Sequence, residues 1–335
     1  MNCIVCAIAK MENAYIYEWA SYHVQLGFRY IHIYDNNDVN GERVEDVFRG
    51  TPIEKQIIIH DVRGKKYIQK RVYQECYDTE DFEWCAFIDV DEFITLPDSQ
   101  DINAYLETMK GWDAVHLNWM CYGDNGMINK DARSVTERFS KPWGKDVRYT
   151  YYNHRENEHI KSIIRKGLTI DWVSGEDSNP HTPKGLQEIC NAIGLQVKNE
   201  PFAPVFHEGA YIRHYITKTI EEYAVKVERQ CADCDAQYYS YFKFFRVNTP
   251  SMRKLRWLKL HHPAVSIWEC IKEHIRYVIV NNNLPLKQFV KAYKRQMSEK
   301  EGYENKLQAF SRRQKDVLGN ASSGGVNHCM VLVWQ

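Results

Sequence analysis

This chain of 335 residues lacks several features that would place it at once in a large class of proteins. It has no net charge, because 44 Lys and Arg residues balance 44 Asp and Glu residues. No overall field therefore attracts nucleic acid, and we expect no nucleic-acid partner. It has no run of about 18 apolar residues, so no membrane-spanning helix is predicted. Its first residues show neither a charged leader nor a small-residue cleavage site, so a cytoplasmic location is expected.

Cysteine is present, but not in the pattern of a secreted disulfide framework. We interpret the ten cysteines as reduced and mostly buried thiols. Two pairs have the spacing Cys-x-x-Cys, which admits a zinc site: Cys3 with Cys6, and Cys231 with Cys234. The first pair falls in a predicted strand, where residues three apart point to opposite faces, so we interpret Cys3 and Cys6 as small core side chains.

The stretch FIDVDEF at residues 87–93 is the most informative part of the sequence. The apolar run Trp84–Ile88 is typical of a buried strand, and three carboxylates follow it, those of Asp89, Asp91 and Glu92. In an open α/β sheet, ligands collect at the carboxyl ends of the strands. This Asp-x-Asp is therefore placed to hold a divalent cation against a phosphorylated substrate. The alternative is a solvated acidic loop.

Strand and helix patterns alternate along the first hundred residues. The sequence predicts strands at 3–9, 30–34, 56–60 and 84–88, a helix with Tyr15, Trp19, Tyr22 and Leu26 on one face, and helices at 44–48 and 65–77. Strands separated by helices in this order favour a mostly parallel sheet with helices on its faces. The predicted fold class is therefore α/β.

Polar residues follow two further strands of the predicted sheet. Asp35 and Asn36 come after the second strand, and Asp61 after the third, so all three would share an edge with Asp89. There they could accept hydrogen bonds from a base or a ribose, while Lys70 or Arg71 meets a diphosphate. Taken singly, Asp35 and Asp61 are also typical turn or cap residues.

Nine short blocks of the sequence form a more specific pattern. They are Lys10–Asn13, Glu18–Trp19, Tyr22–Gly27, Ile33–Asn36, Phe87–Phe93, Leu117–Gly123, Lys161–Arg165, Pro180–His181 and His214–Lys226. In this order they resemble the bacterial glycosyltransferase family 2-like proteins, which are related in pattern to glycosyltransferase family 92. The resemblance implies a GT-A fold, in which a Rossmann-like sheet flanked by helices binds a nucleotide sugar.

The same resemblance implies an inverting, metal-dependent transferase that uses Mn²⁺ or Mg²⁺. Asp91 would be the direct metal ligand, Asp89 a contact to the donor ribose or to metal-bound water, and Asp35 or Asn36 a contact to the nucleoside. Asn13 joins the donor-binding set. A UDP-sugar is the expected donor. The expected acceptor is a glycan or a lipid-linked saccharide, in the synthesis of cell-surface polysaccharide or lipopolysaccharide.

Inverting transfer also needs a general base beside the acceptor hydroxyl. Asp124, which follows a predicted strand at 114–119, is the preferred candidate, and Glu176 and Asp177 compete with it. The composition Gly-Asp-Asn-Gly around Asp124 is also typical of a tight turn.

Two histidines and a lysine complete the predicted site. His181 could be a third metal ligand, or a hydrogen-bonded loop residue. His214 and Lys218 precede the sequence Thr219-x-x-Glu222, which predicts a capping box. Since a helix start favours an anion, we expect His214 and Lys218 to touch the donor diphosphate.

We predict three regions. Residues 1–235 form the catalytic domain, with a nucleotide-sugar half (1–110) and an acceptor half (111–235). Residues 236–318 form a helical extension, and 319–335 a flexible tail. Basic and aromatic residues alternate near Arg253–Trp257, which suits contact with the inner face of an anionic membrane. The alternative is that these helices only pack on the catalytic domain.

Two other functions compete with transfer. A haloacid-dehalogenase-like phosphatase also places Asp-x-Asp after a buried strand, with the first Asp as nucleophile. That motif normally continues with Thr or Val, whereas Glu92 follows here. The other competitor is a non-catalytic module that binds a sugar nucleotide or a metal.

Overall fold

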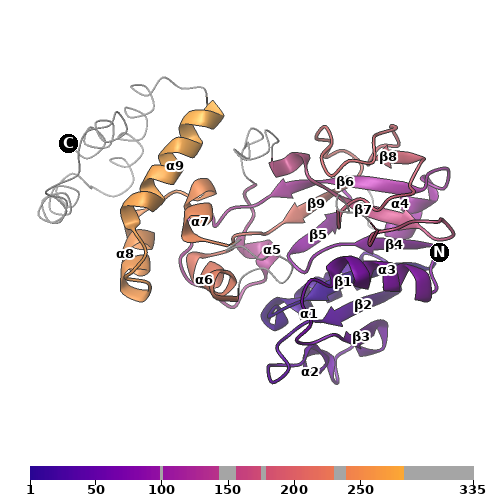
Figure 1. The fold of residues 1–335 in the computed structure, drawn as a ribbon, viewed down its shortest axis with the longest axis horizontal. Coiled ribbons are helices and arrows are strands. Elements are labelled where there is room, and N and C mark those ends of the chain that lie inside the picture. Colours follow the sequence, from indigo (N-terminus) through magenta and orange to yellow (C-terminus); the bar gives the residue numbers. More distant parts are fainter. Residues whose placement is uncertain (99–100, 143–155, 175–178, 230–238, 283–335) are drawn as a thin grey trace, which may run out of the picture. The chain divides into compact units, whose positions relative to one another are not determined.

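The computed structural model describes residues 1–98, 101–142, 156–174, 179–229 and 239–282 (Figure 1). The chain divides into two compact units, Met1–Phe244 and Phe245–Gln335. The predicted domain boundary at 235 and the predicted tail 319–335 fall outside the described residues. The predicted division into three regions therefore stays a prediction.

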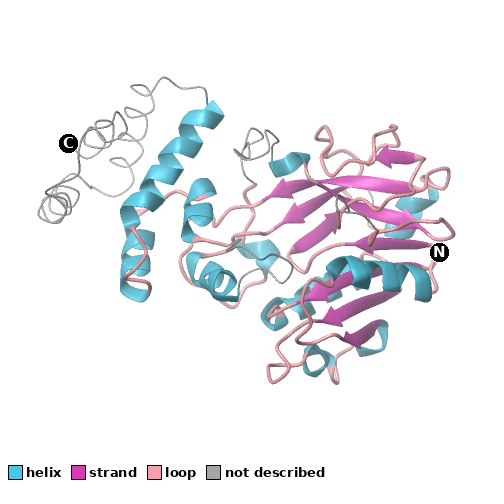
Figure 2. Ribbon diagram, in the orientation of Figure 1, coloured by secondary structure: helices cyan, strands magenta, loops and turns pink. Residues whose placement is uncertain are grey.

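The first unit alternates strands and helices along its N-terminal part and is richer in strands after residue 110 (Figure 2). Its elements are β1 (Cys3–Ala9), α1 (Asn13–Gln25), β2 (Tyr30–Asp35), α2 (Val44–Phe48), η1 (Glu54–Gln56), β3 (Ile57–Asp61), α3 (Gln69–Thr79), β4 (Trp84–Phe87), β5 (Glu92–Thr95), α4 (Ile102–Glu107), β6 (Ala114–Cys121), α5 (Val135–Arg138), η2 (Glu156–Glu158), β7 (Ile160–Arg165), β8 (Ile189–Asn191), β9 (Tyr211–His214) and α6 (Ile220–Arg229).

The described strands form one sheet in the order β3-β2-β1-β4-β7-β6-β9-β5, and β8 pairs with β6. Five of the eight pairings are parallel: β1–β2, β1–β4, β2–β3, β6–β8 and β6–β9. The pairings β4–β7, β6–β7 and β5–β9 are antiparallel. The predicted α/β class with a mostly parallel sheet is confirmed.

The central strand β1 is buried on both faces, as expected for a strand between parallel neighbours. Successive side chains of a strand point to opposite faces. Val5 packs in one core cluster with Trp19 of α1, whereas Ile4 packs in a second cluster with Val72 of α3. Helices α1 and α3 therefore cover opposite faces of the parallel strands.

The cysteines described in β1 behave as predicted. Cys3 and Cys6 are fully buried free thiols, which confirms their interpretation as core side chains. Cys231 and Cys234 lie outside the described residues.

Helix α3 starts later than predicted. It begins at Gln69, because Tyr67 has φ 53, a left-handed conformation that an α-helix does not contain. Lys65 and Lys66 are exposed loop residues before the helix. The predicted start at residue 65 is therefore wrong, whereas β1 and α2 have the predicted bounds.

The second unit contains α8 (Met252–His261) and α9 (Ile267–Asn282), and α7 (Tyr241–Val247) includes the point of division. Within this unit, Arg246 forms an ion pair of 2.8 Å with Glu273, and the His274 ring contacts the carbonyl of Phe245. In the part of the chain that the structure describes, every helix is too short or too polar to cross a membrane.

Candidate functional site

Three carboxylates follow β4: Asp89 and Asp91 lie in the turn between β4 and β5, and Glu92 is the first residue of β5. The Asp89 N–H donates to Glu92 Oε2 at 2.8 Å, so the turn is closed by its own side chain. The N–H of Tyr215, the residue after β9, donates to the Asp91 carbonyl at 2.9 Å. Asp91 and Glu92 are buried, whereas the Asp89 side chain is about one-third exposed. The Asp-x-Asp therefore stands at the end of a buried strand, as the sequence predicts.

Each of the two aspartates has a buried lysine beside it. Lys161 of β7 places Nζ 2.7 Å from Asp89 Oδ2 and 3.4 Å from Glu92 Oε2. Lys226 of α6 places Nζ 2.5 Å from Asp91 Oδ2 and 2.9 Å from the Ile216 carbonyl. The negative charge of the motif is thus compensated by two ammonium groups from distant parts of the chain.

Burial and these ammonium groups set the protonation states. Burial is the largest single influence on Asp91 and by itself would raise its pKa, but the neighbouring cations, Lys226 first, together outweigh it and hold that pKa well below its usual range. Burial raises the pKa of Glu92 well above its usual range in spite of Lys161. Burial lowers the pKa of His214, whose Nε2 lies 3.6 Å from Asp91 Oδ1, to about 3. At neutral pH His214 is therefore a neutral imidazole beside an ionised aspartate.

Asp91 belongs to a larger group that we call the strand-end charge cluster: Glu12, Asp91, Lys218, Lys226 and Arg229. Glu12 follows β1 and lies 3.7 Å from Lys218 Nζ and 2.6 Å from Arg229 Nη2. The cluster holds three cations and two carboxylates. It therefore has one positive charge in excess at the carboxyl ends of β1 and β4.

Lys218 is the cation of this cluster with the least favourable surroundings. It is buried, and burial lowers its pKa in spite of Glu12. Its backbone has φ 50, which is unfavourable for a residue with a side chain. Backbone strain of this kind persists where the surrounding structure enforces it, and functional sites are the usual places.

The predicted metal ligands Asp89, Asp91 and His181 do not converge in the structure. Among the described residues, the one group of three His, Cys, Asp or Glu ligand atoms within 4.8 Å of one another lies elsewhere. A cation at Asp91 would also have to displace Lys226 from its carboxylate. The residues as arranged do not fit a bound cation, and the Mn²⁺ or Mg²⁺ requirement stays a prediction.

His181 is held as a hydrogen-bonded loop residue. Its Nδ1 lies 2.9 Å from the Ile160 carbonyl and so carries the proton, and its own carbonyl accepts the hydroxyl of Ser162 at 2.6 Å. Burial lowers the pKa of His181 well below its usual range. This geometry favours the alternative considered for His181.

The polar residues after β2 order their own loop. The Asp35 carboxylate accepts hydrogen bonds from the backbone N–H groups of Asn37 and Val44, at 3.0 and 2.9 Å. The Asn36 side-chain amide donates hydrogen bonds to two carbonyls in the loop after β3. The Asn13 side-chain oxygen accepts a hydrogen bond of 2.9 Å from the Asn37 side-chain amide. All of these bonds lie at the predicted edge of the sheet. The donor contacts of Asn13, Asp35 and Asn36 stay predictions.

The residues predicted to flank the donor on the third strand and on α3 are more exposed. Arg63 binds Asp61 at 2.8 Å, and this hydrogen bond lowers the pKa of Asp61 to about 2. Lys70 is half-buried in the first turn of α3, next to Gln69, which donates to Asp89 at 3.2 Å. Arg71 is exposed. The structure therefore brings the start of α3 to Asp89, and Lys70 rather than Arg71 lies on its half-buried side.

Asp124, the preferred general base, is a buried turn residue. Its Oδ1 accepts the N–H of Gly126 at 2.8 Å, and Asn125 and Gly126 have φ of 48 and 79. The turn interpretation is therefore correct for the backbone, and a catalytic role stays a prediction. Glu176 and Asp177 lie outside the described residues.

Residues outside the predicted set complete the surroundings. Thr219 and Glu222 form the predicted capping box, and Glu222 also accepts two bonds from buried Arg138, at 2.7 and 2.8 Å. The sequence prediction missed Glu12, Lys161, Lys226 and Arg229 as members of the site. The first three fall inside the resemblance blocks, which is the one signal that could have identified them.

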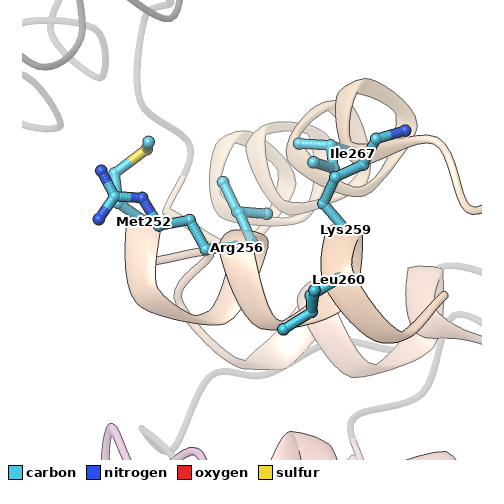
Figure 3. A pocket seen from close by; sticks show the side chains of 6 residues that line it. Met252, Arg256, Lys259, Leu260 and Ile267 are labelled. Carbon is cyan, nitrogen blue, oxygen red and sulfur yellow. The ribbon is translucent and has the colours of Figure 1, made fainter. Parts of the chain in front are cut away.

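The second unit presents a basic helix. In α8 the side chains of Arg253, Arg256 and Lys259 are exposed. An open cavity of about 330 Å³ is lined by Met252, Leu255, Arg256, Lys259, Leu260 and Ile267 (Figure 3). Membrane contact through this unit stays a prediction.

Comparison with known proteins finds relatives among the glycosyltransferase family 92 proteins. The chain is 28% identical over 200 residues to a glycosyltransferase family 92 protein of Oryza sativa subsp. japonica. This match covers 58% of this chain and 32% of the rice protein. It is 27% identical over 208 residues to a family 92 protein of Arabidopsis thaliana, covering 58% of this chain and 34% of that protein. The chain spans about a third of the length of these relatives. No family model matches the sequence.

Among solved structures, the chain is similar to residues 1–349 of S. aureus TarS. One structure of TarS, in complex with UDP-GlcNAc, has a TM-score of 0.39 and 12% identity, and the match covers 88% of this chain and 80% of that one. Another has a TM-score of 0.36 and 13% identity, covering 95% and 88%.

The relatives agree with the family 92 part of the predicted resemblance. These relatives are plant proteins, so they give no support to the bacterial part. The expected cytoplasmic location stays a prediction.

Proposed function

We propose that this chain is a glycosyltransferase. It binds a nucleoside-diphosphate sugar at the carboxyl ends of β1, β2 and β4 and transfers the sugar to a glycan or lipid-linked acceptor. The observation that carries the proposal is the strand-end charge cluster, with three cations against two carboxylates. A diphosphate supplies the negative charge that this cluster lacks. The family 92 relatives support the reaction class.

The chemistry follows from where charge develops. When the sugar leaves its donor, negative charge builds on the departing diphosphate, and donors already in place stabilise it at low reorganisation cost. Lys226 is buried and held by Asp91, and Arg229 is partly buried and held by Glu12. Charge-assisted bonds from such groups are stronger than neutral ones, and more so away from water.

The finer features remain predictions within this proposal. They are inversion at the anomeric carbon, a UDP-sugar as donor, a divalent metal, and a role in cell-surface polysaccharide or lipopolysaccharide synthesis. The general base is Asp124, or alternatively Asp177 or Glu176.

The test is an incubation of the purified chain with a panel of nucleotide sugars, with and without Mn²⁺. We expect release of a nucleoside diphosphate from one donor, and its loss in Asp91→Asn and Lys226→Met. Lys198→Met, which removes an exposed lysine on a loop, is the matched control and should keep full activity. If no donor is cleaved or raises the melting temperature, and Asp91→Ala changes nothing, the proposal fails.

The same assay separates the competing functions. Phosphate release from a generic phosphoester would favour the phosphatase, and tight binding of a sugar nucleotide without turnover would favour a binding module. If a chelator abolishes the activity and the Lys226→Met variant keeps it, a metal acts at Asp91. If the activity survives the chelator but is lost in Lys226→Met, the lysine binds the diphosphate.

A further inference from the structure

Three potential metal ligands meet on the α3 face of the sheet, away from the strand-end charge cluster. His32 Nδ1 lies 3.2 Å from His60 Nε2 and 3.6 Å from Glu80 Oε2. His60 Nε2 lies 4.0 Å from Glu80 Oε1. These side chains come from β2, from β3 and from the residue after α3. Among the described residues they are the one group of three His, Cys, Asp or Glu side chains whose ligand atoms all lie within 4.8 Å of one another.

The pairing of β2 with β3 explains why the two rings meet. The strands are parallel, with His32 opposite Ile58 and Tyr34 opposite His60. Alternate residues share a face, so His32, Tyr34 and His60 all point towards α3. The His60 ring stacks on Tyr34 at 4.2 Å between centroids, which holds its Nε2 towards His32.

The distances fit a small tetrahedral ion. With bonds of about 2.0–2.1 Å, ligand atoms of a tetrahedral zinc site lie about 3.4 Å apart. Here the two imidazole nitrogens lie 3.2 Å apart, and Glu80 places Oε2 3.6 Å from the His32 nitrogen and Oε1 4.0 Å from the His60 nitrogen, so all three contacts are near that value. Two imidazole nitrogens and a carboxylate oxygen are also a donor set that zinc and related transition metals accept, whereas Mg²⁺ and Ca²⁺ prefer oxygen alone.

Partial exposure gives an ion a way in. The His32 side chain is buried, but those of His60 and Glu80 are 22% and 25% exposed. The group is also separate from the Asp89 turn. Helix α3 starts beside Asp89 through Gln69 and has 11 residues, so its far end, next to Glu80, lies about 16 Å away.

We propose that His32, His60 and Glu80 bind one divalent transition-metal ion of the zinc class, with water in the fourth position. The ion ties β3 to its neighbour β2 and to the end of α3. In the described sheet β3 is a terminal strand that pairs with β2. Bound there, the ion would stabilise this edge of the sheet, and the site does not depend on the proposed transferase activity.

The test is a titration of the full-length, metal-stripped chain with Co²⁺ and with Zn²⁺. We expect one equivalent of Co²⁺ to give the visible absorption of a tetrahedral site, Zn²⁺ to displace it, and Zn²⁺ to raise the melting temperature. Glu80→Gln and His60→Gln should each weaken binding roughly tenfold or more. Glu75→Gln, an exposed carboxylate of α3, is the control and should bind as the wild type does.

Far-ultraviolet circular dichroism of the metal-free variants shows whether they fold. We expect the wild-type spectrum, because both substituted side chains are partly exposed. Three results would overturn the proposal. They are no binding in the wild type, equal binding in the wild type and both ligand variants, and a thiolate-to-cobalt charge-transfer band. The last would assign the ion to the buried thiols of Cys6, Cys76 and Cys85 instead.

Discussion

Lys226 Nζ lies 2.5 Å from Asp91 Oδ2, and the two residues are 135 positions apart in the chain. Both side chains are buried. The pair joins α6 to the turn after β4 and compensates the aspartate that the sequence predicts as a metal ligand. It therefore links the stability of the first unit to the charge of the candidate site.

Removing the lysine should leave Asp91 as a buried, poorly compensated charge. We expect Lys226→Met to lower the free energy of unfolding by about 3–5 kcal/mol, measured by urea denaturation. The double variant Asp91→Asn/Lys226→Met should recover most of this loss, because no unpaired charge remains. Equal losses in the single and double variants would show that the pair does not couple as described.

A second buried pair allows a matched comparison. Arg138 binds Glu222 through two bonds with both side chains buried, whereas Arg133 binds Asp131 at 2.6 Å at the surface. Arg138→Met should destabilise the chain by about 3–5 kcal/mol, because Glu222 loses its main counter-charge. Arg133→Met should change stability by less than about 0.5 kcal/mol. Thermal or urea unfolding of both variants measures the difference, and similar effects would contradict this assignment.

His116 should make the fold sensitive to acid. It is buried in β6, neither ring nitrogen has a hydrogen-bond partner among the described residues, and burial lowers its pKa to about 3. An unfolded imidazole titrates near about 6.5. Between these values the unfolded chain binds the additional proton, so His116 lowers stability as the pH falls from about 6.5 towards about 3.

The check is His116→Phe, which keeps an aromatic ring without titratable nitrogens. Its melting temperature should fall less than that of the wild type between about pH 7.5 and about pH 5. The matched control is His261→Phe, which removes an exposed histidine of α8. A wild-type pH dependence in His116→Phe would contradict the prediction.

Asp124 offers a test of catalysis that spares the turn. Asp124→Asn keeps the oxygen that accepts the Gly126 N–H but cannot take a proton. If Asp124 is the general base, kcat should fall about 10²- to 10⁴-fold while the KM for the donor changes little. Unchanged turnover would reduce Asp124 to its turn role and move attention to Glu176 and Asp177.

The local parts of the fold could be predicted because they depend on local patterns. The apolar run at 3–9 gives β1, and the strand rhythm gives a mostly parallel sheet. The start of α3 could not be predicted, because it depends on a left-handed Tyr67 that the helical periodicity does not reveal.

The composition of the site was less accessible. Asp89 and Asp91 stand out because charges follow a buried strand, but their partners come from β7 and α6. Which lysine reaches which aspartate depends on sheet order and register, and β7 runs antiparallel between β4 and β6. The same holds for His32 and His60, whose shared face follows from a register that the sequence does not specify.

Calorimetric titration with UDP and with a panel of UDP-sugars measures whether Lys226 holds the nucleotide diphosphate, when wild type and Lys226→Met are compared in the presence of a chelator. The wild type should bind one nucleotide per chain, and Lys226→Met should bind at least about tenfold more weakly, while Lys198→Met binds normally. Absence of nucleotide binding by the wild type, with and without added Mn²⁺, would contradict this prediction.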